Sequence, residues 1–308
     1  MAGSQLSPGQ HPIARIITHT DFDGVCSAVI LRAVLGPLPV LFAEPWTIED
    51  GALRALPTDA VVDLPLPRSG CALWFDHHPT GGDPAGNPAY HLDATQPSCA
   101  GYLYRTYAPT HDLARFAPLI REVDKIDSAR FTPDDIRHPS SANRISITIQ
   151  RKPEDDPYRH LLVEALATHS VDEVAKLPHV RERWSRYEHA YAANLAATEA
   201  VLTTRGDVLL VDYTILPGEA PETTPFDLFL HHENAQYAIR AKRDDGADRV
   251  KISVSGNPFT RPNRVHLGTL VKRYGGGGHQ GAGGCGIAAS EKDRVLAEML
   301  AALLDGQV

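Results

Sequence analysis

The stretch Trp74-Phe75-Asp76-His77-His78-Pro79 indicates how the first part of the chain folds. Gly70 to Phe75 is a short, largely apolar run of the kind that forms a strand buried on both faces. One carboxylate and two imidazoles stand where that strand should end, before a turn signal of one proline and two glycines. In an open parallel sheet the carboxyl ends of the strands line the ligand crevice, so this position predicts a site. Taken alone, the pattern is equally compatible with solvated histidines on a loop.

A second polar cluster follows the first predicted strand, Ile13 to Thr18. His19, Asp21 and Asp23 alternate there, so an extended backbone would place all three on one side. Val25 to Leu35 then has helical character, and either aspartate could serve as the cap of that helix. A cap accounts for neither the histidine nor the second aspartate. We therefore interpret the cluster as a set of metal ligands.

Two further segments place carboxylates where predicted elements end. After a second strand at 38–43, Ala60 to Val62 forms a third, and the prolines that follow Asp63 prevent a central strand from continuing. A helix predicted over Leu113 to Ile126 ends near Asp124 and Asp127. Either aspartate could cap that helix or pair with a neighbouring Lys or Arg, and we expect one of the two to be a ligand.

Composition excludes several classes of protein. The 308 residues are 43% hydrophobic and 22% charged, as expected for a folded globular protein. No apolar run approaches the ~20 residues of a membrane span, and Met1 to Pro12 lacks the pattern of a secretory signal. The four cysteines form no metal-binding pair in sequence, so we expect a reduced, cytoplasmic protein without a membrane partner. The net charge of −8 argues against a protein that coats polyanions.

The order of the predicted elements indicates two domains of different architecture. Strands and helices alternate in the first half, whereas strands succeed strands after a long helical stretch at 178–200. We predict an α/β protein with an N-terminal, doubly wound parallel-sheet domain over residues 1–180. A helical connector over 181–204 leads to a smaller C-terminal α+β domain with a mixed sheet over 205–308.

The last motif is a glycine run, Gly275 to Gly278, followed by His279. A flexible linker is the simplest interpretation, but helical and strand-like segments flank the run on both sides. Glycines let backbone N–H groups approach a phosphate closely. Residues 237–273 also contain nine Lys or Arg against three Asp, which favours an anion near this region over a merely solvated charged face.

The predicted ligands select the metal and the reaction. Carboxylates with imidazoles and no thiolates favour Mn²⁺, with Mg²⁺ as the alternative. About six ligands from four segments suit two ions ~3.5–4 Å apart that share a carboxylate. Two such ions activate a water molecule for attack at phosphorus, which predicts a hydrolase acting on phosphoric esters or anhydrides.

The same motifs, in this order, resemble those of a known family. The set comprises His19-x-Asp21-x-Asp23, Asp63, Asp76-His77-His78, the Asp124/Asp127 segment and the Gly-Gly-Gly-His that ends at His279. It resembles the DHH phosphoesterases with a DHHA1 C-terminal domain over nearly the whole chain. The length is similar to that of the nanoRNase/pAp-phosphatase (exopolyphosphatase-like) branch and too short for a full RecJ exonuclease.

The resemblance implies a role for each ligand position. One ion would be held by His19, Asp21 and Asp23, while Asp23 and Asp63 would reach the second ion and Asp63 would bridge. His77 would be a ligand, His78 would contact the scissile phosphate, and Asp76 would orient an imidazole. The segment Asp127-Ser-Ala-Arg-Phe aligns with the family's Asp-Thr-Gly-x-Phe, and Asp124 stays an alternative. The implied catalytic residues are Asp63, Asp76 and His78.

The resemblance also implies a substrate site in the second domain, where Gly276, Gly277, Gly278 and His279 would hold a phosphate. The family's Ser-x-Arg-Ser corresponds here to Lys251-Ile-Ser-Val-Ser, without the arginine. Lys251, Arg261 or Arg264 would have to replace it, although Lys and Arg bind phosphate differently.

The function predicted from the resemblance is hydrolysis of short oligonucleotides (nanoRNA) or of pAp. The alternatives are a cyclic or linear dinucleotide phosphodiesterase, an exopolyphosphatase, and a catalytically silent nucleotide-binding module. The sequence leaves open the cleavage polarity and whether the chain forms a homodimer.

Overall fold

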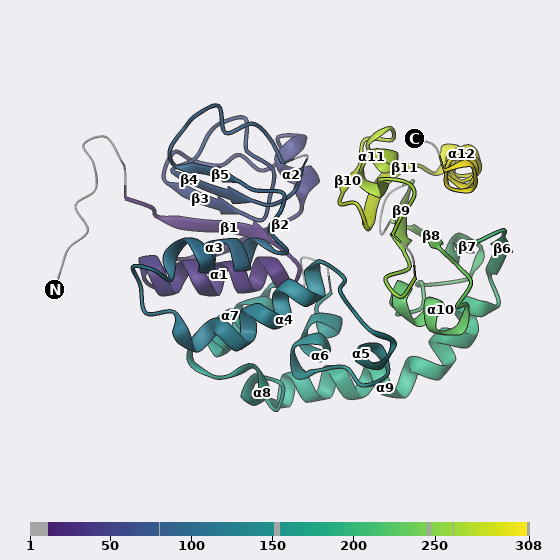
Figure 1. Ribbon diagram of the computed structural model, residues 1–308, viewed down its shortest axis with the longest axis horizontal. Helices are drawn as coiled ribbons and strands as arrows, with labels where there is room; N and C mark the ends of the chain where they lie inside the picture. Colours follow the sequence, from purple (N-terminus) through teal and green to yellow (C-terminus); the bar gives the residue numbers. More distant parts are fainter. Residues whose placement is uncertain (1–11, 80, 151–154, 245–247, 261, 307–308) are drawn as a thin grey trace. The chain divides into compact units, whose positions relative to one another are not determined.

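Figure 1 shows the computed structural model, which describes residues 12–79, 81–150, 155–244, 248–260 and 262–306. Unit 1 contains Met1–Ser128 and Ser140–Arg181, and unit 2 contains Ala129–Pro139 and Glu182–Val308. The division falls within helix α9 (Pro178–Glu199). Strand β6 (Leu202–Arg205) begins inside the range that the sequence predicted as a helical connector. Within the described ranges, no helix is both long and apolar enough to cross a bilayer.

A five-stranded parallel sheet forms the centre of unit 1, as the sequence predicted. The strands are joined in the order β2-β1-β3-β4-β5. The apolar runs at 13–18, 38–43 and 60–62 correspond to the first three strands in the chain. The strands are β1 (Arg15–His19), β2 (Val40–Ala43), β3 (Asp59–Val62), β4 (Leu73–Asp76) and β5 (Tyr90–Leu92).

Both faces of this sheet are buried, because successive side chains point to opposite sides. Ile16 and Phe75 pack on one face against a layer of helices, and Ile17 and Trp74 pack on the other. Figure 1 shows α1 and α3 along the first face. The helices of the layer on this face are α1 (Phe22–Leu35), α3 (Cys99–Tyr107), α4 (Ala117–Asp127), α6 (Ser141–Thr148), α7 (Asp156–Thr168) and α8 (Val171–Val174).

The second face has a thinner cover than a doubly wound sheet usually has. It is covered by the short helix α2 (Pro45–Glu49) and by loop residues such as Leu64. Helix α2 is confined between Pro45 at its start and Gly51 just after its end, where the backbone is left-handed with φ 80°.

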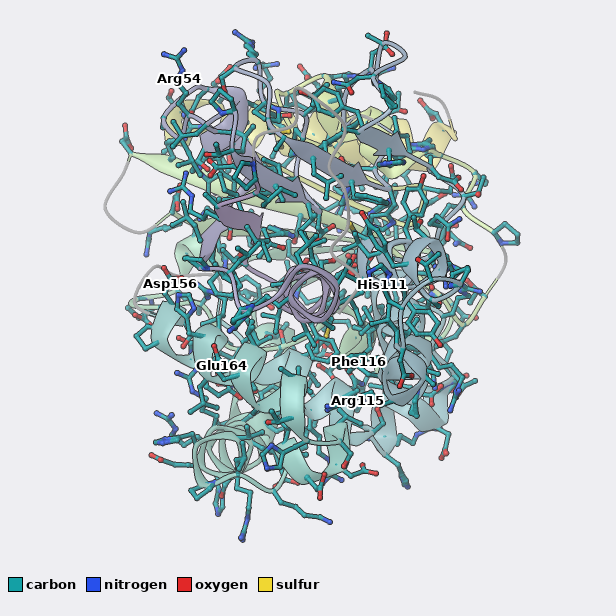
Figure 2. The ribbon with its side chains drawn as sticks, turned by 90° about the vertical axis from the view of Figure 1, so that its left-hand side faces the viewer. Arg54, His111, Arg115, Phe116, Asp156 and Glu164 are labelled. Atoms are coloured by element: carbon teal, nitrogen blue, oxygen red, sulfur yellow. The ribbon has the colours of Figure 1, made fainter. Side chains whose placement is uncertain are left out.

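The 3₁₀ turn that precedes α4 contacts α7. The guanidinium of Arg115 lies 4.7 Å from the centre of the Phe116 ring (Figure 2). Arg115 also donates a hydrogen bond to the carbonyl oxygen of Leu166 in α7 (3.5 Å). Arg115 and Phe116 belong to the 3₁₀ turn Ala114–Phe116, which leads directly into α4.

Unit 2 is built on a mixed six-stranded sheet, as predicted, in the order β10-β11-β9-β8-β7-β6. Only the β7–β8 pair is parallel among these described strands. Helices α11 and α12 pack on one face of the sheet and α10 on the other. The remaining elements are α5 (Pro133–Arg137), β7 (Val208–Asp212), the 3₁₀ turn Tyr213–Ile215, α10 (Pro225–His231), β8 (Tyr237–Arg243), β9 (Arg249–Gly256), α11 (Leu267–Lys272), β10 (Gly277–Gly278), β11 (Ala282–Ala288), the 3₁₀ turn Ala289–Glu291 and α12 (Lys292–Asp305).

Candidate metal centre

The candidate ligands of unit 1 meet at the carboxyl edge of the parallel sheet. His19 is the last residue of β1, Asp63 follows β3, and Asp76 is the last residue of β4. Because β3 pairs in parallel with both β1 and β4, the three strand ends lie side by side. The expectation that these strand ends share one site is therefore met by the topology of the sheet.

One set of donors consists of His19, Asp21 and Asp63. The Nδ1 atom of His19 lies 2.9 Å from Oδ2 of Asp21 and 3.7 Å from Oδ2 of Asp63. Asp21 also caps α1, since its Oδ1 accepts a hydrogen bond from the backbone N–H of Gly24 (3.0 Å). The cap is therefore confirmed, and it leaves Oδ2 of Asp21 facing His19, so the ligand role of Asp21 stays a prediction.

A second set consists of Asp23, His77 and Asp127, again with Asp63. The Nε2 atom of His77 lies 3.2 Å from Asp127, 3.6 Å from Asp23 and 3.7 Å from Oδ1 of Asp63. The two oxygens of Asp63 thus face different sets, as the bridging role requires. Asp23 belongs to the second set in this arrangement, whereas the resemblance placed it with His19 and Asp21 as well.

Neighbouring backbone groups fix the side chains of the second set. The two carboxylate oxygens of Asp23 accept hydrogen bonds from the N–H groups of Cys99 (2.7 Å) and Ala100 (2.8 Å) at the start of α3. Nδ1 of His77 lies 3.1 Å from the carbonyl oxygen of Gln96, which directs Nε2 toward the carboxylates. Such fixed partners orient the donors before any cation binds.

Asp76 binds the backbone of both histidines that follow it and the imidazole of His78. Its Oδ1 accepts hydrogen bonds from the backbone N–H groups of His77 (2.8 Å) and His78 (3.2 Å) and lies 2.7 Å from Nδ1 of His78. A Cβ atom on Gly81 would lie only 1.9 Å from Oδ2 of Asp76, so a side chain there would displace the Asp76 carboxylate. This geometry matches the orienting role that the resemblance implies for Asp76.

The structure separates the two aspartates near the end of α4. Asp127 joins the donor cluster through His77, whereas Asp124 accepts hydrogen bonds from Arg105 (2.8 and 3.3 Å) and from the hydroxyl of Ser98 (2.6 Å). Asp124 thus ties α4 to α3. Of the two alternatives that the sequence left open, we retain Asp127 as the candidate ligand.

The cluster concentrates negative charge away from water. Burial, with the charges of Asp23 and Asp21, raises the pKa of both Asp63 and Asp127 well above the ordinary carboxyl value. Burial opposes the charged form of His19, yet the carboxylates around it, Asp21 first, raise the pKa of its imidazole well above its ordinary value.

Oδ2 of Asp63 is buried and makes no hydrogen bond within the described structure. An unsatisfied carboxylate oxygen of this kind fits a divalent cation such as Mn²⁺ or Mg²⁺, which would neutralise the charge.

Glu44 belongs to this edge although the sequence analysis did not select it. It follows β2 directly, and its Oε2 lies 3.6 Å from Nε2 of His19. The signal was present in the sequence, because the criterion that selected Asp63, an acidic residue at the end of a predicted strand, also applies to Glu44.

In unit 2 the glycine run has a structural explanation. Strand β10 pairs with β11, where Gly277 lies opposite Gly284. A Cβ atom on Gly276 would lie 2.2 Å from the Gly284 carbonyl oxygen, and one on Gly278 would lie 2.3 Å from that of Ala282. The carbonyl oxygen of His279 also accepts a hydrogen bond from the N–H of Gly268 in α11 (2.8 Å). Close backbone packing thus accounts for these glycines, and the phosphate cradle over Gly276 to His279 stays a prediction.

The predicted substrate cations are already engaged. Nζ of Lys251 lies 2.8 Å from Asp244, and Arg264 pairs with Asp207 through two contacts of 2.9 and 3.2 Å. Arg261 lies outside the described residues. Lys251 and Arg264 are thus each paired with a carboxylate. Phosphate binding by Lys251, Arg261 or Arg264 stays a prediction.

No protein-family model matches the chain, and no curated protein matches its sequence. Solved structures do match. The pGpG-specific phosphodiesterase PggH from Vibrio cholerae is 24% identical, with a TM-score of 0.71, over 95% of this chain and 99% of that one. The DHH domain of a protein described as a member of a family of ribosomal proteins is 12% identical (TM-score 0.59; 96% and 88% covered).

RecJ from Thermus thermophilus, solved in complex with Mn²⁺, is 13% identical, with a TM-score of 0.58 over 95% of this chain and 52% of RecJ. At these identities the similarities establish a fold, and they agree with the resemblance that the motifs indicated. This chain has the fold of the DHH-domain proteins.

Proposed function

We propose that the protein is a metal-dependent phosphoesterase with two divalent cations at the carboxyl edge of the parallel sheet. The observation that supports this most is Asp63, whose two oxygens face two separate sets of buried donors. A carboxylate shared in this way suits a pair of ions. When bound, such ions would activate a water molecule and neutralise the charge that develops on a phosphate.

The side chains then have distinct tasks. His19 and Asp21 hold one cation, Asp23, His77 and Asp127 hold the other, and Asp63 spans both. His78 is positioned by Asp76, which lies 2.7 Å from its Nδ1. In the doubly protonated imidazole, Nδ1–H donates to that carboxylate and Nε2–H is free to donate a hydrogen bond to a phosphate oxygen, which would stabilise its negative charge in the transition state.

The substrate that we propose is a linear dinucleotide or another very short oligonucleotide. The similarity to a pGpG-specific phosphodiesterase over 95% of this chain supports a linear dinucleotide, which the sequence analysis gave as an alternative. The other activities to be tested are hydrolysis of pAp, of cyclic dinucleotides and of polyphosphate. A silent nucleotide-binding module is disfavoured, because every ligand position of the motifs is filled by a donor residue.

A hydrolysis panel with Mn²⁺ or Mg²⁺ tests this proposal. It contains pGpG, a second dinucleotide, a short and a long RNA, pAp, a cyclic dinucleotide and polyphosphate. We expect rapid turnover of the dinucleotides, slower turnover of the short RNA and none of the long RNA. The His77→Asn variant should be inactive on all of them. No turnover of any substrate by the wild-type protein with either metal would reject the proposal.

We also propose that the protein works in the reduced cytoplasm. All four cysteines are free, and burial raises the thiol pKa of Cys26 and Cys99 well above its ordinary value. Protonated thiols do not compete for the cations, which agrees with a site made of carboxylates and imidazoles.

A further inference from the structure

Glu44 is held firmly beside the candidate centre. Strand β2 runs parallel to β1 with Ala43 opposite His19, so the next residue, Glu44, lies at the carboxyl edge of the sheet. The hydroxyl of Thr20 donates a hydrogen bond to its Oε1. The backbone carbonyl oxygen of Glu44 accepts hydrogen bonds from the N–H (3.0 Å) and the hydroxyl (2.7 Å) of Thr47. Backbone and side chain are thus both fixed, and only 12% of the side chain is exposed.

The two ring nitrogens of His19 face different partners. Nδ1 points to the donor set, with Asp21 at 2.9 Å and Asp63 at 3.7 Å. Nε2 points to Glu44, whose Oε2 is 3.6 Å away, and makes no hydrogen bond within the described structure. Since 8% of the His19 side chain is exposed, water offers little alternative to the carboxylate.

His77 provides an internal comparison for this arrangement. Its Nδ1 faces a fixed backbone oxygen, that of Gln96, and its Nε2 faces the carboxylates of the second donor set. His19 shows the same division with the two nitrogens exchanged, and Glu44 takes the place of the backbone oxygen. In both His19 and His77, one ring nitrogen faces the candidate metal ligands and the other faces an oxygen atom that the fold holds in place.

We propose that Glu44 is the positioning residue of His19: its carboxylate accepts the Nε2–H and leaves the lone pair on Nδ1 for a cation. A neutral imidazole carries its single proton on one nitrogen, so the acceptor at Nε2 selects the form that can bind metal through Nδ1. Nε2 of His19 and Oε2 of Glu44 are 3.6 Å apart, slightly beyond the distance of a formed hydrogen bond. This inference rests on the proposed metal centre.

Binding of Mn²⁺ and Mg²⁺, measured by calorimetry without substrate, tests the inference. We expect Glu44→Ala to lose about 10–100-fold in affinity for one ion, the range found when such outer partners are removed. Glu44→Gln should lose less, because its amide oxygen still accepts the Nε2–H. The matched control is Glu49→Ala, which removes the same charge from an exposed position at the end of α2. Thermal unfolding in EDTA verifies that each variant is folded.

Nitrogen-15 NMR of His19 in the Mg²⁺-loaded protein supplies a readout that general loss of stability does not move. We expect the proton on Nε2 in both proteins, but in Glu44→Ala the Nε2–H resonance should shift and exchange faster with water, because that proton has lost its carboxylate acceptor. Wild-type affinity in Glu44→Ala, or a proton on Nδ1 in the loaded wild-type protein, would overturn the inference. If the wild-type protein bound neither ion, the proposed function itself would fail, so the two failures are distinguishable.

Discussion

Asp63 shows how a single residue serves both the backbone and the site. Its φ of 57° lies in the left-handed region, where Asp and Asn are tolerated better than other residues with a side chain. It is only 2% exposed, and its carboxylate lies between two histidines. In the metal-free protein, burial and the nearby charges of Asp23 and Asp21 raise the pKa of the Asp63 carboxyl.

Replacing Asp63 by Asn should separate binding from folding. Asn suits the same backbone but cannot bridge two cations, so we expect turnover to fall by about 10³-fold or more. We also expect the metal-free variant to be at least as stable as the wild-type protein, because a buried like charge has been removed. Thermal unfolding in EDTA and in Mn²⁺ measures both effects on stability, and the hydrolysis panel measures turnover. Retained turnover in this variant would contradict the two-ion centre.

The neighbours Asp124 and Asp127 give a matched pair of variants. We expect Asp127→Asn to weaken Mn²⁺ binding at least about tenfold, because it removes a candidate ligand. Asp124→Asn should keep its Mn²⁺ affinity and lose about 1 kcal/mol of stability, since the ion pair with Arg105 is then lost. Calorimetry and denaturant unfolding measure the two quantities. The reverse pattern would make Asp124 the ligand.

At the scale of elements, the hairpin of β10 and β11 tests what the glycine run does. Gly278 has a φ of 151°, and a Cβ atom there would lie 2.3 Å from the carbonyl oxygen of Ala282. Gly281 lies three residues later, between β10 and β11, and the nearest atom to a Cβ there is 4.0 Å away, on Asn263. The two glycines of this hairpin therefore differ in how closely the backbone packs around them.

We expect Gly278→Ala to reduce the free energy of unfolding by about 1–3 kcal/mol, as overpacking usually does. Gly281→Ala should change it by less than about 0.5 kcal/mol. Urea unfolding of both variants gives the comparison. Equal, negligible effects would show that the packing of β10 does not require glycine, and a role in binding anions would then be the better explanation of the run.

For the whole molecule, the site couples stability to pH. Asp63 and Asp127 have raised pKa values, so the folded protein holds protons that the unfolded chain loses above about pH 4. His19, whose pKa is also raised, contributes stability that is lost as the pH rises through its folded value. Both effects have the same sign, so the metal-free protein should become less stable as the pH rises.

A series of thermal unfolding experiments between about pH 4.5 and 8 checks this prediction. In EDTA we expect Tm to fall with pH, and Asp63→Asn to show a shallower slope. In Mn²⁺ the stabilisation by metal should grow with pH, because the ligands must lose their protons to bind. A metal-free Tm that rises across this window would count against the buried charge of the cluster.

Much of the fold was predictable because its signals are local. Apolar runs of strand length that end in Asp or His predicted β1, β3 and β4, and the rule for parallel sheets then brought their ends together. Glu44 carries the same signal at the end of β2, so its place at this edge was predictable as well. Strand β5, by contrast, begins with Tyr90 and His91 and contains no buried apolar run from which a strand could be predicted.

The sequence by itself determined which residue types stand at the strand ends, and with them the parallel sheet and the class of site. Only the tertiary structure shows that Asp127 lies beside His77 while Asp124 pairs with Arg105. The two lie three residues apart on a helix of about 3.6 residues per turn and so share a face, and Arg105 of α3 engages the first. It also decided that Asp23 joins His77 and that Glu44 faces His19. Such pairings depend on contacts between segments distant in the chain, which no local pattern of residues encodes.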